Sequence, residues 1–162
     1  MEFKVNVTSE DIQCETFDHK GEMVILLRFL SETLSDEDEE KIIEALRSFV
    51  SFQKKTPRPY HIIIDTHKVL VFPVDRIITI YNYINRKEKY LRQHAISTSY
   101  LIQGKVAELA LQTLNGMFDT WTINKTFQCL PTANRDRVRG IPSDMFSQIL
   151  EFIDTSAPPT VR

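Results

Sequence analysis

The sequence predicts an α/β domain with a mixed sheet, and three observations support this. Short apolar segments of strand length alternate with amphipathic segments of helix length along most of the chain. Such alternation favours parallel strands joined by right-handed helical crossovers. The opening of the chain has strand patterns with no helix between them, which predicts an antiparallel pair. The length of 162 residues, with 42% hydrophobic and 26% charged residues, suits one domain with a full core.

The N-terminal segment is predicted to form strands. Residues 2–8 alternate apolar and polar side chains, as a half-buried strand does. Residues 23–30 are apolar enough to be covered on both faces. Before them, residues 19–22 form a predicted turn in which Gly21 takes a positive φ. The strand at 23–30 pairs in a hairpin with residues 2–8 or with the stretch around residues 14–17, and the sequence leaves both pairings open.

The clearest helix covers residues 35–55. Ser35 is a favoured N-cap residue, acids crowd the first turn, and lysines close the last turn. This order of charges complements the helix dipole at both ends, so we interpret the acids as a solvated helix start and not as a binding motif. Prolines then break the helix, and residues 60–65 form a strand that ends in Asp65.

Further helices and strands complete the pattern. Helices are expected over residues 74–93, 104–119 and 143–154, and strands over residues 96–103 and 120–130. The helix at 104–119 is expected to turn one apolar row inward: Val106, Leu109, Ala110, Leu114 and Met117.

The last part of the chain is predicted from its turn and cap residues. Residues 134–142 are expected to form a loop, and Ser143 is expected to cap the last helix. The polar, proline-bearing residues 155–162 are predicted to be a loose tail. The predicted order is therefore β-β-α-β-α-β-α-β-α, in a single domain over residues 1–154 with helices covering the sheet.

Composition and charge argue against several classes of function. The net charge of −2 lacks the basic excess of a nucleic-acid binder, so nucleic acid is not an expected partner. No apolar run reaches the roughly 20 residues of a membrane span, and residues 1–15 carry no signal pattern, so we expect a cytoplasmic protein. The two cysteines are far apart and the four histidines are scattered. We therefore expect no metal site and no cofactor, and reduced, partly buried thiols.

Asp65 and His67 are the strongest candidates for catalysis, because an acid two residues from a histidine can hydrogen-bond to it. No serine or cysteine follows in the GxSxG pattern of a nucleophile elbow. Gly104 and Lys105 lack the spacing of a P-loop. Gly104 is interpreted as a tight strand-to-helix turn, with anion binding at the helix start as the alternative. We therefore expect no catalytic residues and no enzymatic activity.

The stretch IIIDTHKVLVFPVDRI, at residues 62–77, carries a family resemblance. A hydrophobic strand ends in Asp65, and an apolar lead-in at residues 69–72 precedes a helix. With the element order over residues 3–153, this resembles the STAS domain of anti-sigma-factor antagonists and sulphate-transporter tails. It also resembles the SpoIIAA-like proteins, which share features with lipid-binding CRAL-TRIO domains.

The chain departs from that family at its phosphorylation turn. Where the family carries Asp-Ser-Ser-Gly, this chain has residues 73–76, and the phosphorylatable serine falls on Val74. Asp75 is interpreted as the cap of the following helix, and the alternative is a permanent negative charge in place of phosphate.

The resemblance implies a non-enzymatic, regulatory protein-interaction domain. It would dock a protein partner through the loops at the carboxyl ends of its strands. The partner-binding residues expected from it are Thr66, His67, Lys68, Val74, Asp75, Arg76, Gly104 and Lys105. The alternative is a module that binds a small ligand, a lipid or a nucleotide, in a pocket lined by Ile80, Tyr83, Leu111 and Phe118. A homodimer that pairs the strand at residues 2–8 also stays open.

Overall fold

A six-stranded mixed sheet forms the centre of the fold. The computed structural model describes residues 6–8, 10–69, 74–87, 91–117, 122–129 and 136–156. The strands lie in sequence order: β1 (Asn6–Thr8), β2 (Ile12–His19), β3 (Glu22–Phe29), β4 (Tyr60–Asp65), β5 (Ala95–Ile102) and β6 (Ile123–Gln128). The pairs β1–β2 and β2–β3 are antiparallel, and β3 to β6 run parallel. The predicted α/β class and mixed sheet are confirmed.

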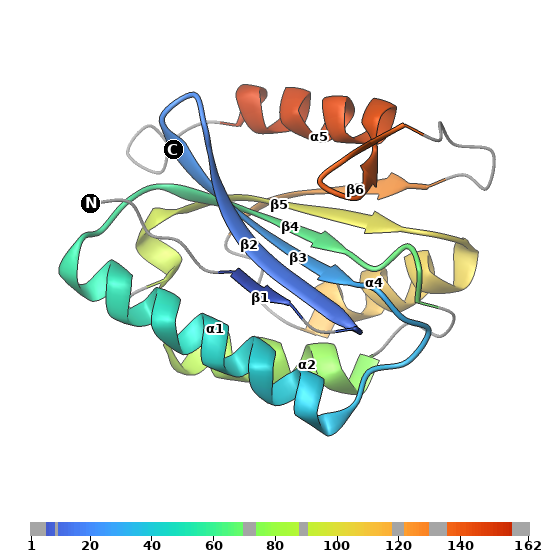
Figure 1. Ribbon diagram of the computed structural model, residues 1–162, viewed down its shortest axis with the longest axis horizontal. Helices are drawn as coiled ribbons and strands as arrows, with labels where there is room; N and C mark the ends of the chain where they lie inside the picture. The colour runs from blue at the N-terminus through green and yellow to red at the C-terminus, as the bar shows by residue number, and fades with distance from the viewer. Residues whose placement is uncertain are drawn as a thin grey trace.

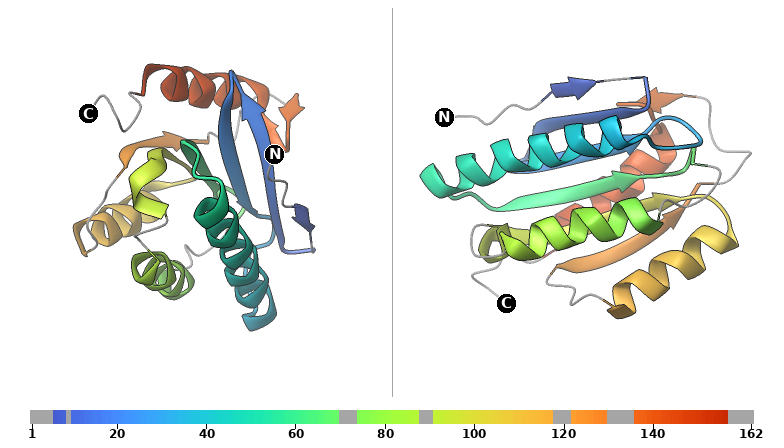
Figure 2. Two further views of the ribbon diagram at one scale, coloured as in Figure 1. Left: turned by 90° about the vertical axis from the view of Figure 1, so that its left-hand side faces the viewer. Right: turned by 90° about the horizontal axis from the view of Figure 1, so that it is seen from below.

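Helices cover both faces of this sheet (Figures 1 and 2). One face carries α1 (Asp36–Lys55), α2 (Val74–Arg86) and α4 (Lys105–Met117), and the other carries α5 (Ser143–Thr155). A 3₁₀ turn, η1 (Arg92–His94), precedes β5, and a hairpin of β7 (Arg137–Val138) and β8 (Ile141–Pro142) precedes α5. Within the described residues, no helix combines the length and apolarity needed to cross a membrane.

The carboxyl ends of the parallel strands lie at one edge of the sheet. Because β3 to β6 point the same way, their carboxyl ends meet at one side of the molecule, which we call the carboxyl edge. The helices α1, α2 and α4 begin there, each directly after one of these strands in the chain. In α/β sheets this is the edge at which ligands and partners usually bind.

The turn and cap residues of the first elements lie where local sequence signals predict them. In the turn between β2 and β3, Lys20 and Gly21 have φ values of 51° and 85°, the left-handed pair of a type I′ hairpin. Of the two partners that the sequence left open for the strand at 23–30, the stretch around residues 14–17 is the one observed: β2 pairs with β3, and β1 pairs with β2 and not with β3. Ser35 and Asp38 form a reciprocal capping box: each side chain accepts from the other residue's backbone N–H at 3.1 Å.

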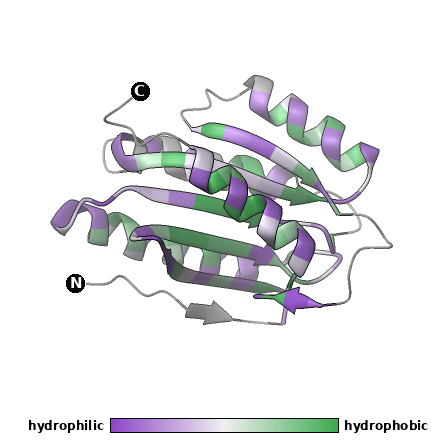
Figure 3. Cartoon of the chain, turned by 90° about the horizontal axis from the view of Figure 1, so that it is seen from above, coloured by the Kyte–Doolittle hydropathy of each residue, from purple (hydrophilic) through white to green (hydrophobic). Residues whose placement is uncertain are grey.

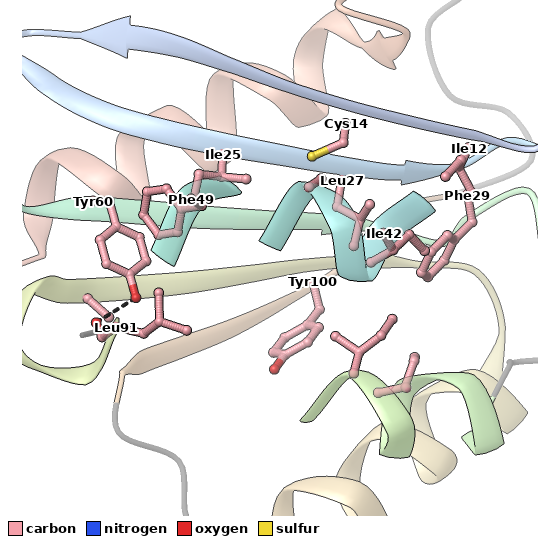
Figure 4. Packing of buried hydrophobic residues seen from close by; sticks show 14 of the residues in the cluster. Ile12, Cys14, Ile25, Leu27, Phe29, Ile42, Phe49, Tyr60, Leu91 and Tyr100 are labelled. Atoms are coloured by element: carbon pink, nitrogen blue, oxygen red, sulfur yellow. Dashed lines mark hydrogen bonds between the residues drawn. The ribbon is translucent and has the colours of Figure 1, made fainter. Parts of the chain in front are cut away.

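Two apolar cores lie on the two faces of the sheet. The larger core lies beneath α1, α2 and α4, and it contains a Phe49–Tyr60 edge contact with ring centroids 4.8 Å apart (Figure 4). The Tyr60 hydroxyl donates to the Leu91 carbonyl at 2.6 Å, so this buried phenol is satisfied. The smaller core packs Phe146 and Ile149 of α5 on the opposite face. The central strands are mostly apolar, whereas the helices carry both polar and apolar residues (Figure 3). This is expected of a sheet that helices cover on both faces.

The inward face of α4 differs from the predicted one. Leu111 and Leu114 are buried, as part of a stripe that includes the half-buried Ala107. Val106 and Leu109 are 79% and 57% exposed, so their predicted inward position was wrong. The reason is that α4 carries two apolar stripes, and the sheet can cover only one of them.

Several boundaries also differ from prediction. Residues 134–142 contain the β7–β8 hairpin where only a loop was expected, with φ values of 52° at Arg139 and 82° at Gly140. Pro142 is the N-cap of α5, and Ser143 is its first residue, with its N–H bonded to the Asp136 carbonyl at 2.8 Å.

Helix ends account for the other differences. Asp75 lies inside the first turn of α2, because the helix already begins at Val74, so Asp75 is not the N-cap. The helix α2 ends at Arg86, earlier than predicted, and α5 continues through Thr155, one residue past the predicted end of the domain.

Candidate functional site

A row of polar side chains crosses three strands at the carboxyl edge, on the face covered by α5. Gln13, Arg28 and Asp65 lie side by side because strand register pairs Gln13 with Arg28 and Arg28 with Asp65. Arg28 Nε donates to Asp65 Oδ2 at 3.1 Å, and Arg28 Nη1 donates to Gln13 Oε1 at 2.8 Å. Arg28 and Asp65 are both buried, so this is a charge-assisted pair in a low-dielectric site.

His67 joins this row through a tight turn. The strand β4 ends at Asp65, so the two residues do not share a strand face. Instead Asp65 Oδ1 accepts from the His67 backbone N–H at 3.1 Å and also contacts His67 Nδ1. This is an Asx-type turn, and it confirms the Asp65–His67 contact. With the proton on Nδ1, His67 Nε2 faces Arg137 Nη1 at 3.4 Å as an acceptor.

The β7–β8 hairpin packs over this row of polar side chains and contacts Arg28. The Gly140 carbonyl accepts from Arg28 Nη2 at 3.0 Å and from Arg137 Nη1 at 3.3 Å. A Cβ atom on Gly140 would lie 2.0 Å from Arg28 Nη1, so only glycine fits above this guanidinium. Sequence reasoning missed Arg28 and Gly140. A charged residue inside an otherwise apolar strand was the available signal for Arg28, because a buried charge needs a partner.

This network has the features of a structural element more than of a reactive centre. Each described charged group in it already binds an oppositely charged or polar neighbour. The nearby thiol of Cys129 has its pKa raised, mainly by burial and then by the Asp65 carboxylate, so it is not an activated thiolate. Both Cys14 and Cys129 are buried free thiols. Among the described residues, no group of three metal-ligating side chains is close enough to hold a metal ion.

The predicted partner-binding residues lie together at the carboxyl edge but differ in accessibility. Thr66 and His67 are buried, and the Thr66 hydroxyl donates to the Leu101 carbonyl at 3.3 Å. Val74 packs against the larger core. Arg76 is held by acids at the start of α1, with Arg76 Nη1 2.7 Å from Asp36 Oδ1. Four residues of the set present exposed surface: Lys68, Asp75, Gly104 and Lys105.

Gly104 occupies a fixed strand-to-helix turn. Its φ is 94°, a value that glycine adopts without strain. The Gln128 side chain clamps it from β6: Gln128 Oε1 accepts from Gly104 N at 3.0 Å, and Gln128 Nε2 donates to the Gly104 carbonyl at 3.2 Å. The start of α4 is therefore presented on a rigid support.

The predicted ligand-pocket residues fall in the core. Ile80 and Leu111 are buried in the larger core, Tyr83 is half-buried, and Phe118 lies outside the described residues. Their packing therefore does not support the hypothesis that they line a pocket for a small ligand.

A second buried polar group lies beneath α5, away from the carboxyl edge. His61 Nδ1 is 2.6 Å from Ser97 Oγ on the neighbouring strand, and His61 Nε2 is 3.4 Å from Glu22 Oε2. His61 and Ser97 are fully buried. Burial lowers the pKa of His61, and the Glu22 carboxylate opposes this shift only in part. The imidazole is therefore neutral near neutral pH, and acid forces a charge into the sheet.

This burial predicts a pH-dependent stability. Since the folded pKa of His61 is lowered, its contribution is complete above the unfolded value of about 6.5 and is lost as the pH falls below it. We expect the midpoint of urea unfolding to decrease when the pH is lowered from about 7.5 to about 5.5. The decrease should be smaller in His61→Asn. An equal fall in both proteins would show that His61 does not carry this dependence.

Comparisons with known proteins assign neither a family nor an activity to this chain. No protein-family model matches the chain, and no curated protein matches it. Among solved structures, it is similar to the MdcD–MdcE heterodimer of Pseudomonas malonate decarboxylase, at a TM-score of 0.47 and 9% identity. The match covers 96% of this chain and 81% of that chain. Likeness at this level does not transfer an activity or a partner, so function is argued from the site alone.

Proposed function

We propose that this protein is a non-enzymatic interaction domain that docks a protein partner at the carboxyl edge and the start of α4. The observation that carries this proposal is the exposure of Val106 and Leu109, at 79% and 57%. They lie one helical turn apart, directly after the exposed Gly104 and Lys105. Such a rigid apolar surface beside polar side chains is a typical protein-binding site.

The absence of a catalytic role is part of the proposal. Arg28 and His67 both bind Asp65, and all three residues are buried, while the exposed Arg137 contacts His67 Nε2. A general acid or base must reach its substrate, and here both carboxylate oxygens of Asp65 already accept hydrogen bonds. The resemblance to STAS-like regulatory domains suggests the same role, in which a preformed surface binds without chemistry.

Affinity capture with paired variants tests the docking surface. The variant Val106→Asp/Leu109→Asp places charges on the exposed stripe of α4, and Gln148→Asp places one on an exposed position of α5, on the opposite face of the sheet. We expect a protein that co-purifies with the wild type and with Gln148→Asp to be lost from the double variant. Loss from both, or retention by both, would contradict docking at this stripe. Equal circular dichroism spectra would show that all three proteins are folded.

A further inference from the structure

We infer that the partner presents an acidic, amphipathic segment to one patch, made of Lys68, Lys105, Val106 and Leu109. This inference rests on the proposed function and names the chemistry of the partner at that same surface. The apolar half of the patch is the stripe of α4 that the sheet leaves uncovered. Leu109 is 57% exposed while Leu111 of the same helix is 1% exposed, so the stripe points away from the core. An apolar partner side chain is needed to remove this surface from water.

The polar half of the patch is cationic. Lys68 follows β4 and Lys105 follows β5, and these strands are neighbours that end in register, with Asp65 beside Leu101. The Thr66 backbone N–H donates to the Leu101 carbonyl at 2.8 Å, which joins the two loops. Both lysines are exposed, and within the described residues no acid forms an ion pair with either. Each ammonium can therefore bind a carboxylate of the partner.

The acids near this edge lie elsewhere or are engaged. Glu108, one turn after Lys105, accepts from Gln128 Nε2 at 3.4 Å. Asp75 lies in the first turn of α2, next to Arg76 in the chain. Arg76 does not extend the cationic region, because it is bound to Asp36 and Glu39. Lys68 and Lys105 are thus the exposed charged residues of the patch, and Glu108, the acid of α4, is half-buried.

The sign of these exposed charges selects the partner. An acidic segment is attracted to Lys68 and Lys105, whereas a basic segment is repelled by them. The apolar pair contributes the contact area, and the lysines set the sign and orientation of the charged residues around it. A segment with two apolar anchors flanked by Asp or Glu satisfies both requirements.

Peptide display on the intact chain tests this inference. Random peptides of about 15 residues, long enough for a helical turn or two, are selected on the wild type and counted by sequencing. We expect the enriched peptides to combine apolar anchors with excess Asp and Glu. The best of them, synthesised, should bind at least about tenfold more weakly to Leu109→Asp and to Lys68→Glu/Lys105→Glu, and with unchanged affinity to Gln148→Asp. Its affinity should also fall as salt rises.

The possible outcomes test the docking surface and the acidic chemistry of the partner separately. Neutral or basic peptides that depend on Leu109 would overturn the acidic partner and leave the docking surface standing. No enrichment, or peptides insensitive to Leu109→Asp, would overturn the docking surface itself. Self-association of the wild type that Leu109→Asp abolishes would show that a second copy of the chain occupies the patch, which also overturns the acidic segment.

Discussion

Asp65→Asn is expected to destabilise the protein by about 3 to 5 kcal/mol, the loss typical when one partner of a buried ion pair is removed. The substitution keeps the size of the side chain and removes its charge. Arg28 would then be a buried guanidinium without its counter-charge, with only neutral acceptors left: the Gln13 side chain, the Gly140 carbonyl and the amide oxygen of the substituted residue. His67 would also lose the carboxylate that orients its ring. Both effects act against folding, because neither group can reach water without moving the hairpin.

Chemical denaturation of the purified variant measures this loss. Asp75→Asn is the matched control: the same substitution at an exposed position of the same edge should stay within about 0.5 kcal/mol. A double-mutant cycle with Arg28→Met assigns the effect to the pair. If Asp65→Asn cost no more than Asp75→Asn, the network would not be a stabilising element, and Asp65 would become available for another role.

The sequence predicts those elements whose signals are local. The hairpin turn at Gly21, the N-cap at Ser35 and the strand at Tyr60–Asp65 each depend on residues a few positions apart, and the structure has all three. The alternation of strands and helices then leaves few topologies, because parallel crossovers have one hand. Short-range chemistry and chain connectivity are therefore enough for the class of fold.

The candidate site depends on contacts that no local pattern carries. Arg28 meets Asp65 across 37 positions and Gly140 across 112, and both contacts follow from strand register and from a hairpin that packs onto the sheet. The α4 stripe was misassigned for a related reason. Periodicity shows that Val106 and Leu109 share a helix face, but only tertiary packing decides whether the sheet covers that face.

The same contacts explain why the predicted partner-binding residues divide into two groups. Thr66 and His67 turn back onto the sheet because their polar groups bind Leu101 and Asp65. Lys68, on the same loop, and Lys105, at the start of α4, are exposed. A buried network thus fixes the loops, and the exposed residues on them form a preformed surface, which lowers the entropy lost when a partner binds.

Gly140→Ala is expected to destabilise the protein by at least about 3 kcal/mol, more than a left-handed backbone alone explains. The φ of 82° accounts for about 1 kcal/mol when any side chain is added. The rest arises because the new Cβ would lie 2.0 to 2.4 Å from the guanidinium of Arg28. That guanidinium is buried and held by three acceptors, so it cannot swing aside as a surface side chain would.

Gly21→Ala separates these two contributions. Gly21 has a φ of 85°, close to that of Gly140, and no heavy atom lies within 4 Å of the position where its Cβ would be. Gly21→Ala should therefore lower the free energy of unfolding by about 1 kcal/mol, which is the effect of the left-handed backbone alone. In Gly140→Ala/Arg28→Ala the clash is absent, so adding Gly140→Ala to Arg28→Ala should cost no more than Gly21→Ala does. If Gly140→Ala destabilised Arg28→Ala as much as it destabilises the wild type, the effect of Gly140 would arise from the hairpin backbone and not from its close contact with Arg28.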